Sequence, residues 1–128
     1  MTQSNIQIVE QYLQAYTDKD RAAIEAVVDG TFHFSSPRDN RLDRATYFGR
    51  CWKNSEATVG RKLIYCVADG DRVFVTYEAA WKSGKVTRNT EVFTLCDGKI
   101  MEVEVYFGWN VPHDAPDGGF IDMSGGTG

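Results

Sequence analysis

The stretch RKLIYCVADGDRVFVTYEAAWKSGKVTRNTEVFTLCDGKIMEVEVYFGWN, residues 61–110, decides the fold. It contains four long runs of alternating apolar and polar residues, rich in β-branched and aromatic side chains, at residues 61–68, 72–82, 85–95 and 100–110. The connections between these runs are short, and each contains a glycine: Asp69-Gly70-Asp71, Ser83-Gly84 and Asp97-Gly98. Because short glycine-containing connections are typical of hairpins, the stretch predicts a four-stranded antiparallel meander.

The chain before residue 61 supplies helices that can cover one face of this sheet. Residues 4–17 place apolar side chains at helical spacing, and residues 20–28 and 44–52 predict two shorter helices. Between them, residues 31–35 alternate as a short strand and residues 36–42 form a turn-rich connection. Long antiparallel strands that bury one face need a layer of helices there. We therefore expect an α+β fold, in which three N-terminal helices pack on a strongly curved, mixed but mainly antiparallel sheet and enclose a cone.

Length and charge exclude several classes of protein. A chain of 128 residues fits one domain, which we assign to residues 1–111, followed by a partly disordered tail at 112–128 whose last part, 124–128, is rich in glycine. Fourteen Lys and Arg against 18 Asp and Glu give a net charge of −4, which argues against a nucleic-acid partner. No apolar run approaches the ~20 residues of a membrane span, so we expect no membrane partner.

Cysteines and histidines predict neither a metal site nor a cofactor. The three cysteines, Cys51, Cys66 and Cys96, form no C-x-x-C pair. An odd number of cysteines without a recognisable signal peptide predicts reduced thiols and a cytoplasmic protein. The two histidines, His33 and His113, are far apart and show no metal-ligand spacing.

Three short segments carry a resemblance to a known superfamily: VEQYLQAY at residues 9–16, FSSP at 34–37, and DGKI at 97–100 leading to VYF at 105–107. Together with the order of elements over residues 4–110, they resemble the nuclear-transport-factor-2-like superfamily, which includes ketosteroid isomerases and SnoaL-like polyketide cyclases. Residues 36–48 and 106–110 look like a bacterial branch of it. The resemblance implies a cystatin-like α+β barrel.

The resemblance also implies a site. Ketosteroid isomerases combine an aspartate base, on the turn after the first strand, with an oxyanion hole made of a tyrosine and a protonated acid. Tyr12 falls at the tyrosine position and Glu91 at the position of the protonated acid. Ser36 falls at the base position, where a serine cannot abstract a carbon-bound proton unaided. Asp39, on the same connection, is then the candidate base, with a water molecule as the alternative.

Strand alternation adds the residues that would surround these groups. If Glu91 points inward, the neighbouring strands also present aromatic and polar side chains to the inside. Apolar walls with a few oriented polar groups are typical of a small-molecule pocket. The alternatives are an outward Glu91 in a surface ion pair and a solvated Arg38 loop. The predicted ligand-binding residues are Tyr16, Phe34, Ser36, Arg38, Trp52, Tyr77, Asn89, Phe107 and Trp109.

Two functions remain open at this stage. One is a lyase, isomerase or cyclase that acts on a small hydrophobic carbonyl compound through Tyr12 and Glu91 as hydrogen-bond donors. The other is a non-catalytic ligand-binding or dimerisation module of the same fold, since a fold alone does not fix a function. In either case the convex face of the sheet, with Glu102, Glu104 and Tyr106 on its last strand, is expected to form a homodimer.

Overall fold

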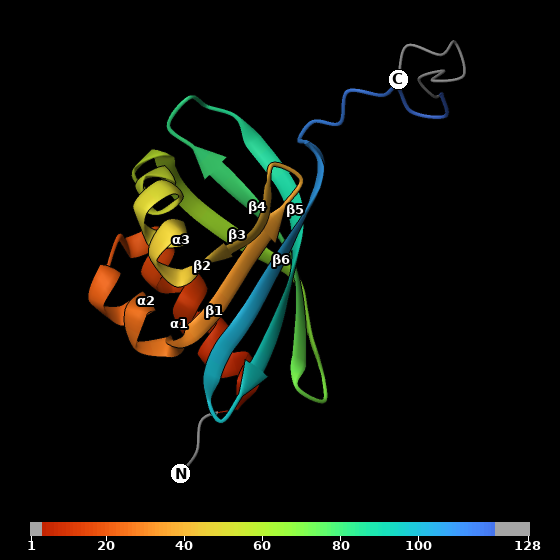
Figure 1. The fold of residues 1–128 in the computed structure, drawn as a ribbon. Helices are drawn as coiled ribbons and strands as arrows, with labels where there is room; N and C mark the ends of the chain where they lie inside the picture. Colours follow the sequence, from red (N-terminus) through yellow and green to blue (C-terminus); the bar gives the residue numbers. More distant parts are fainter. Residues whose placement is uncertain (1–3, 120–128) are drawn as a thin grey trace.

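Within residues 4–119, which the computed structural model describes, three α-helices lie against the concave face of a six-stranded sheet (Figure 1). The expected α+β cone is confirmed. The helices are α1 (Asn5–Asp18), α2 (Arg21–Val27) and α3 (Arg44–Arg50), with a 3₁₀ helix η1 at Trp52–Ala57. The strands are β1 (Val28–Ser36), β2 (Asp39–Asp43), β3 (Thr58–Asp69), β4 (Arg72–Trp81), β5 (Val86–Cys96) and β6 (Lys99–Asn110).

The first helix owes its boundaries to its caps. The Ser4 side chain accepts a hydrogen bond from the backbone of Gln7, whose side chain in turn accepts from the Ser4 backbone. This reciprocal pair satisfies amide groups that the first helical turn leaves free. Lys19 adopts a left-handed conformation and ends the helix. The buried stripe of α1, which includes Tyr12, therefore faces the sheet.

The strands follow the order β2-β1-β6-β5-β4-β3. The four long strands form the expected antiparallel meander, while β1 runs parallel to β6 and makes the sheet mixed. Residues 39–43, which we expected to lie in a turn-rich connection, instead form the edge strand β2, antiparallel to β1. Polar residues are common on an edge strand, so this segment lacks the apolar alternation that marks a strand in sequence.

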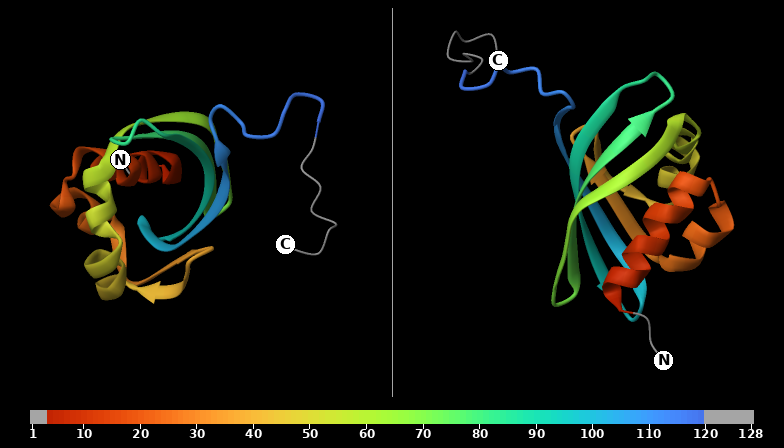
Figure 2. Two further views of the ribbon diagram at one scale, coloured as in Figure 1. Left: turned by 90° about the horizontal axis from the view of Figure 1, so that it is seen from above. Right: turned by 180° about the vertical axis from the view of Figure 1, so that it is seen from behind.

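The sheet curls around the helices, as the view along the cone shows (Figure 2). One register shift that accompanies this curvature lies between Arg88 and Asn89 of β5, opposite β6. Gly108 of β6 lies at this place, and a side chain there would collide with the backbone carbonyl of Arg88. Glycine thus permits a close backbone approach at the bulge. The bend opens one end of the cone.

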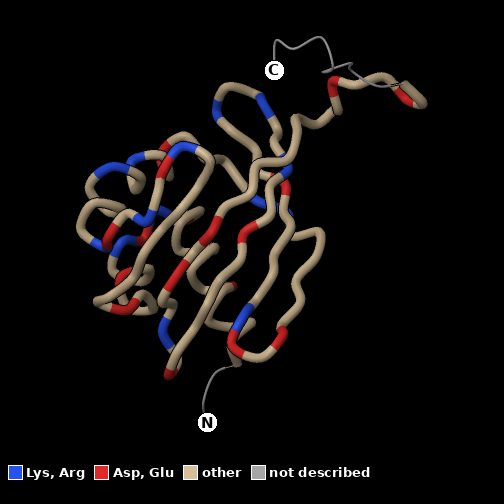
Figure 3. The backbone as a smooth tube through the Cα atoms, turned by 45° about the vertical axis from the view of Figure 1, so that its right-hand side comes forward, with Lys and Arg blue, Asp and Glu red and all other residues tan. Residues whose placement is uncertain are grey.

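The closed end of the cone is the hydrophobic core. Phe32, Ile24, Phe93 and Val103 are fully buried there. Residues 112–119 follow the last strand as bends and turns, whereas the tail residues 124–128 that we expected to be disordered lie outside the described part. Acidic and basic residues are interspersed along both the helical layer and the sheet (Figure 3). In residues 4–119, no helix is long and apolar enough to cross a membrane.

Candidate functional site

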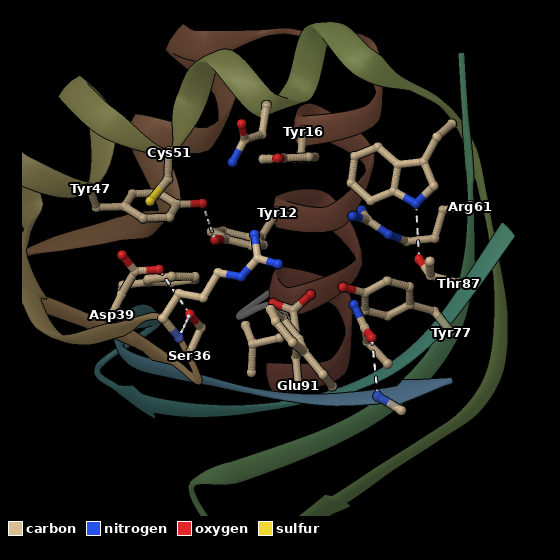
Figure 4. Close-up of a pocket in the computed structure, with 18 of the residues that line it drawn as sticks. Tyr12, Tyr16, Ser36, Asp39, Tyr47, Cys51, Arg61, Tyr77, Thr87 and Glu91 are labelled. Carbon is tan, nitrogen blue, oxygen red and sulfur yellow. Dashed lines mark hydrogen bonds between the residues drawn. The ribbon is translucent and has the colours of Figure 1, made fainter. Parts of the chain in front are cut away.

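A cavity of about 500 Å³ occupies the open end of the cone, between the helices and the concave face of the sheet (Figure 4). All but one of the residues that the sequence analysis assigned to the site line this cavity. The residues that line it are Tyr12, Tyr16, Phe34, Ser36, Arg38, Asp39, Tyr77, Asn89, Glu91, Phe107 and Trp109.

The exception is Trp52, which lies outside the cavity lining. Its ring packs edge-on against Tyr16 and also contacts Phe48. The helix that we expected to reach residue 52 ends at Arg50, and Trp52 begins the 3₁₀ helix η1. This change of helix type leaves the indole packed against the core, where it supports Tyr16 rather than a ligand.

Two tyrosine hydroxyls meet at one side of the cavity. The Tyr12 hydroxyl, from α1, lies 2.5 Å from the Tyr47 hydroxyl, from α3, and both side chains are buried. Burial, the largest cause, raises the pKa of both tyrosines, so both remain neutral phenols. Only one proton lies between the two oxygen atoms. When Tyr47 donates to Tyr12, the Tyr12 proton is available to a ligand.

Glu91 is a buried residue of the cavity lining, 5% exposed. Burial raises its pKa, because a carboxylate loses hydration there. The positive charge of Arg61 and the polar hydroxyl of Tyr77 act in the opposite direction and favour the carboxylate. The raised pKa means that burial outweighs both. Glu91 is thereby biased toward the protonated form, which donates a hydrogen bond.

Ser36 and Asp39 form a unit at the turn between β1 and β2. The Ser36 hydroxyl donates to the Asp39 carboxylate at 2.8 Å and accepts from the backbone amide of Arg38. The hydroxyl thus fixes the direction of the carboxylate, which lines the cavity. The carboxylate of Asp39 is therefore held next to Ser36, which occupies the position that the resemblance assigns to the base.

Arg61 of β3 was not predicted as a site residue, yet it lines the cavity. Its guanidinium carbon lies 4.5 Å from the ring centre of Tyr77 and 5.4 Å from that of Tyr16. One terminal nitrogen donates to the Leu13 carbonyl oxygen at 3.0 Å. Cation–π contacts and this hydrogen bond hold the side chain in place.

The sequence analysis also missed Tyr47 and Cys51. Tyr47 appeared as one member of an apolar helical stripe, and only the packing of α3 against α1 shows that its hydroxyl reaches Tyr12. Cys51 lines the cavity, and burial raises the pKa of its thiol, which therefore stays protonated and weakly nucleophilic. The inward position of Arg61, opposite Ala79, depends on the β3–β4 register, which includes a shift between Thr58 and Gly60.

Comparison with known proteins gives a family and a fold. The model of a family described as SnoaL-like domain matches residues 9–103. An NTF2-like protein of unknown function from Cytophaga hutchinsonii is 19% identical, with 84% of this chain and 93% of that chain covered and a TM-score of 0.68. An NTF2-like protein from Burkholderia thailandensis is 22% identical, with 84% and 92% covered and a TM-score of 0.66.

An LEH-like epoxide hydrolase from M. tuberculosis is 20% identical, with 81% of this chain and 82% of that chain covered and a TM-score of 0.70. At such identities, the likeness to these structures shows the fold alone. A search of curated proteins gave no match.

Proposed function

The chain belongs to the SnoaL-like domain family, and from this premise we propose that it binds a small, mainly apolar carbonyl compound and moves a proton next to that carbonyl group. The reaction class would be an isomerisation, cyclisation or elimination. The observation that carries the proposal is that two buried groups, the Tyr12 hydroxyl and the Glu91 carboxyl, line one cavity of about 500 Å³, where burial raises the pKa of both.

The donor pair supports stabilisation of negative charge on a carbonyl oxygen. When a proton leaves the carbon next to a carbonyl, negative charge develops on the oxygen, and fixed donors in a water-poor site stabilise it. The Tyr12 hydroxyl is positioned by its hydrogen bond with Tyr47, and the backbone of Glu91 is fixed within strand β5. Both groups are buried, so little reorganisation is needed when the charge develops.

The proposed base is Asp39. Its carboxylate is oriented by the Ser36 hydroxyl and lines the same cavity as the donor pair. A carboxylate that faces a bound substrate can accept a proton from carbon once the carbonyl oxygen is stabilised. One fold neighbour of this chain is described as an LEH-like epoxide hydrolase, which supports an enzymatic role for a chain of this fold.

A non-catalytic ligand-binding module is the second candidate. The observation that favours it is Ser36 at the position of the isomerase base, with Asp39 engaged in a hydrogen bond to that serine. In this case the carbonyl compound would bind to Tyr12 and Glu91 without loss of a proton.

Proton exchange separates the two candidates. The methyl protons of 4-acetylbenzamide lie next to its ketone carbonyl, and proton NMR in D₂O follows their replacement by deuterium. We expect the protein to accelerate this exchange, and Asp39→Asn to slow the accelerated rate by about 10²-fold or more, as for loss of a general base. Asp69→Asn, which removes an exposed carboxylate of β3 outside the cavity, is the matched control and should leave the rate unchanged.

Each result decides between the candidates. Acceleration that Asp39→Asn removes supports the enzyme. Saturable binding of 4-acetylbenzamide without acceleration supports the binding module. Acceleration that persists in Asp39→Asn eliminates Asp39 as the base. Absence of binding by both 4-acetylbenzamide and the corresponding acid, 4-acetylbenzoate, contradicts both candidates.

A further inference from the structure

We propose that the ligand of this cavity is an anion, a small apolar oxo acid whose carboxylate is bound by Arg61. The inference rests on the proposed function, because it gives the carbonyl compound a second recognition group. In the cavity, Arg61, Tyr77 and Thr87 lie on one side, while Tyr47, Cys51 and Asp39 lie on the other, with Glu91 between them (Figure 4).

The position of Arg61 is fixed before any ligand arrives. Its side chain leaves β3 opposite Ala79 of β4, where the small neighbour leaves room for it. The guanidinium group lies between the rings of Tyr16 and Tyr77, and one terminal nitrogen, Nη1, donates to the Leu13 carbonyl at 3.0 Å. A donor that is already held loses little side-chain entropy when it binds an anion.

The charge of Arg61 has no carboxylate partner within salt-bridge distance in residues 4–119. The ion pairs in that range involve four other arginines, Arg21, Arg41, Arg44 and Arg88. The Nε of Arg61 is buried without a hydrogen-bond partner, and the hydrogen bonds found for its guanidinium group come from Nη1. The second terminal nitrogen, Nη2, is therefore available. Arg61 is half-buried, and its buried Nε has no partner among the described residues. A ligand carboxylate would supply a charge-assisted hydrogen-bond partner.

The field of Arg61 acts inside the cavity. It lowers the pKa of Tyr16 and of Glu91, although burial outweighs it in both cases. Glu91 is thus the acid whose pKa responds to the charge of Arg61. Burial nevertheless biases Glu91 toward its protonated form. The other charged side chains of the lining are Asp39, on the side opposite Arg61, and Arg38, whose guanidinium carbon lies 5.9 Å from the ring centre of Phe107 (Figure 4). The bias of Glu91 toward its protonated form reduces the negative charge available to compensate Arg61.

A carboxylate at Arg61 would also orient the substrate. With one end of the molecule held there, its body lies across the apolar walls and its carbonyl group is directed away from Arg61, toward Tyr12 and Glu91. The ligand anion would further disfavour a second negative charge on Glu91. Binding of the oxo acid therefore favours the form of Glu91 that donates a hydrogen bond.

Two probes that differ only in charge test this inference. These are 4-acetylbenzoate and its neutral amide, 4-acetylbenzamide, whose dissociation constants are measured at pH 7 by titration calorimetry. We expect the acid to bind at least about tenfold more tightly than the amide, as for one charge-assisted hydrogen bond in a partly buried site. Arg61→Gln should remove this preference, and Arg61→Lys should keep part of it.

The controls separate a ligand contact from a structural role. Arg72→Gln, in an exposed hairpin outside the cavity, should keep the full preference. Glu91→Gln should keep the preference for the acid, because the amide is neutral, like the protonated carboxyl group it replaces. Circular dichroism shows whether Arg61→Gln is folded. If it is not, folded Arg61→Lys decides, because it should reduce the acid-to-amide ratio, and an unreduced ratio would overturn the inference.

Equal affinity of the wild-type protein for the two probes would overturn the inference and leave the proposed function standing. An acid preference that survives in folded Arg61→Gln would also overturn it. Failure of both probes to bind would contradict the proposed function as well.

Discussion

At the scale of single residues, the site depends on the protonation of Glu91. Burial raises the pKa of this carboxyl, whereas Arg61 and Tyr77 lower it, and burial has the larger effect. A neutral acid among tyrosines can donate a hydrogen bond, which a carboxylate cannot do. Tyr12 and Tyr47 remain neutral for the same reason, since burial is the largest cause of their raised pKa values.

The raised pKa of Glu91 predicts a pH dependence of stability. In the unfolded chain the carboxyl has its ordinary pKa of 4.5, and in the folded chain its pKa is higher. As the pH rises above about 4.5, the unfolded state loses this proton first, so the free energy of unfolding falls until the pH passes the folded pKa. Urea unfolding of the wild type and of Glu91→Gln, from pH 4 to pH 8, measures this effect.

The variant isolates Glu91 from the other acids. Hydrogen bonds from Thr31 to Asp29 and from Thr46 to Asp43 lower the pKa of these two acids below the ordinary value of 3.8. Their contributions to the pH dependence are the same in both proteins and cancel in the difference. We expect the stability of the wild type relative to Glu91→Gln to decrease over the titration range of Glu91. A difference that stays constant or increases over that range would contradict the raised pKa.

Individual site residues differed in how far sequence could predict them. Tyr12 and Glu91 followed from family spacing together with strand alternation, and both lie in the cavity. The roles of the other three residues were not predicted correctly. The position of Tyr47 depends on how α3 packs on α1, and that of Arg61 depends on the β3–β4 register. The position of Trp52 depends on where α3 ends. These are tertiary properties that local patterns do not encode.

At the scale of the elements, sequence predicted the structure wherever a segment had its own periodicity. The helices and the four-stranded meander have strong apolar patterns and short turns, and they agree with the structure to within a few residues. The edge strand β2 has a polar sequence, so its pairing with β1 was missed. The parallel contact between β1 and β6 joins segments that are distant in the chain, and no local signal specifies it.

At the scale of the whole molecule, the convex face of the sheet exposes apolar side chains. Tyr65 and Val67 of β3 are 63% and 59% exposed, and Tyr106 of β6 is 54% exposed. Phe74 of β4, which pairs with Val67, is 39% exposed. These residues alternate with side chains that face the core, so the helices do not cover them. We propose that two copies of the chain pair through this face, as expected from the sequence.

Sedimentation velocity at about 20 µM tests this assembly, since an interface of standard size buries about 1,600 Å² in total and holds at such concentrations. We expect a dimer for the wild type and a monomer for Tyr65→Asp, because a charge would be buried without a partner at the interface. Val59→Asp replaces an apolar side chain of similar exposure at the other end of β3 and is the control. A wild-type monomer, or a Tyr65→Asp dimer, would contradict the proposal.

The central claim is that Tyr12 and Glu91 donate hydrogen bonds to a carbonyl oxygen in the cavity. Infrared spectroscopy of 4-acetylbenzamide, labelled with ¹³C at its ketone carbon, measures this directly, because hydrogen bonds lower the carbonyl stretching frequency. We predict that the band of the bound probe lies below its position in water, and that Tyr12→Phe and Glu91→Ala each reverse part of this shift. A bound band at or above the water position, or a shift that both variants retain, would contradict the claim.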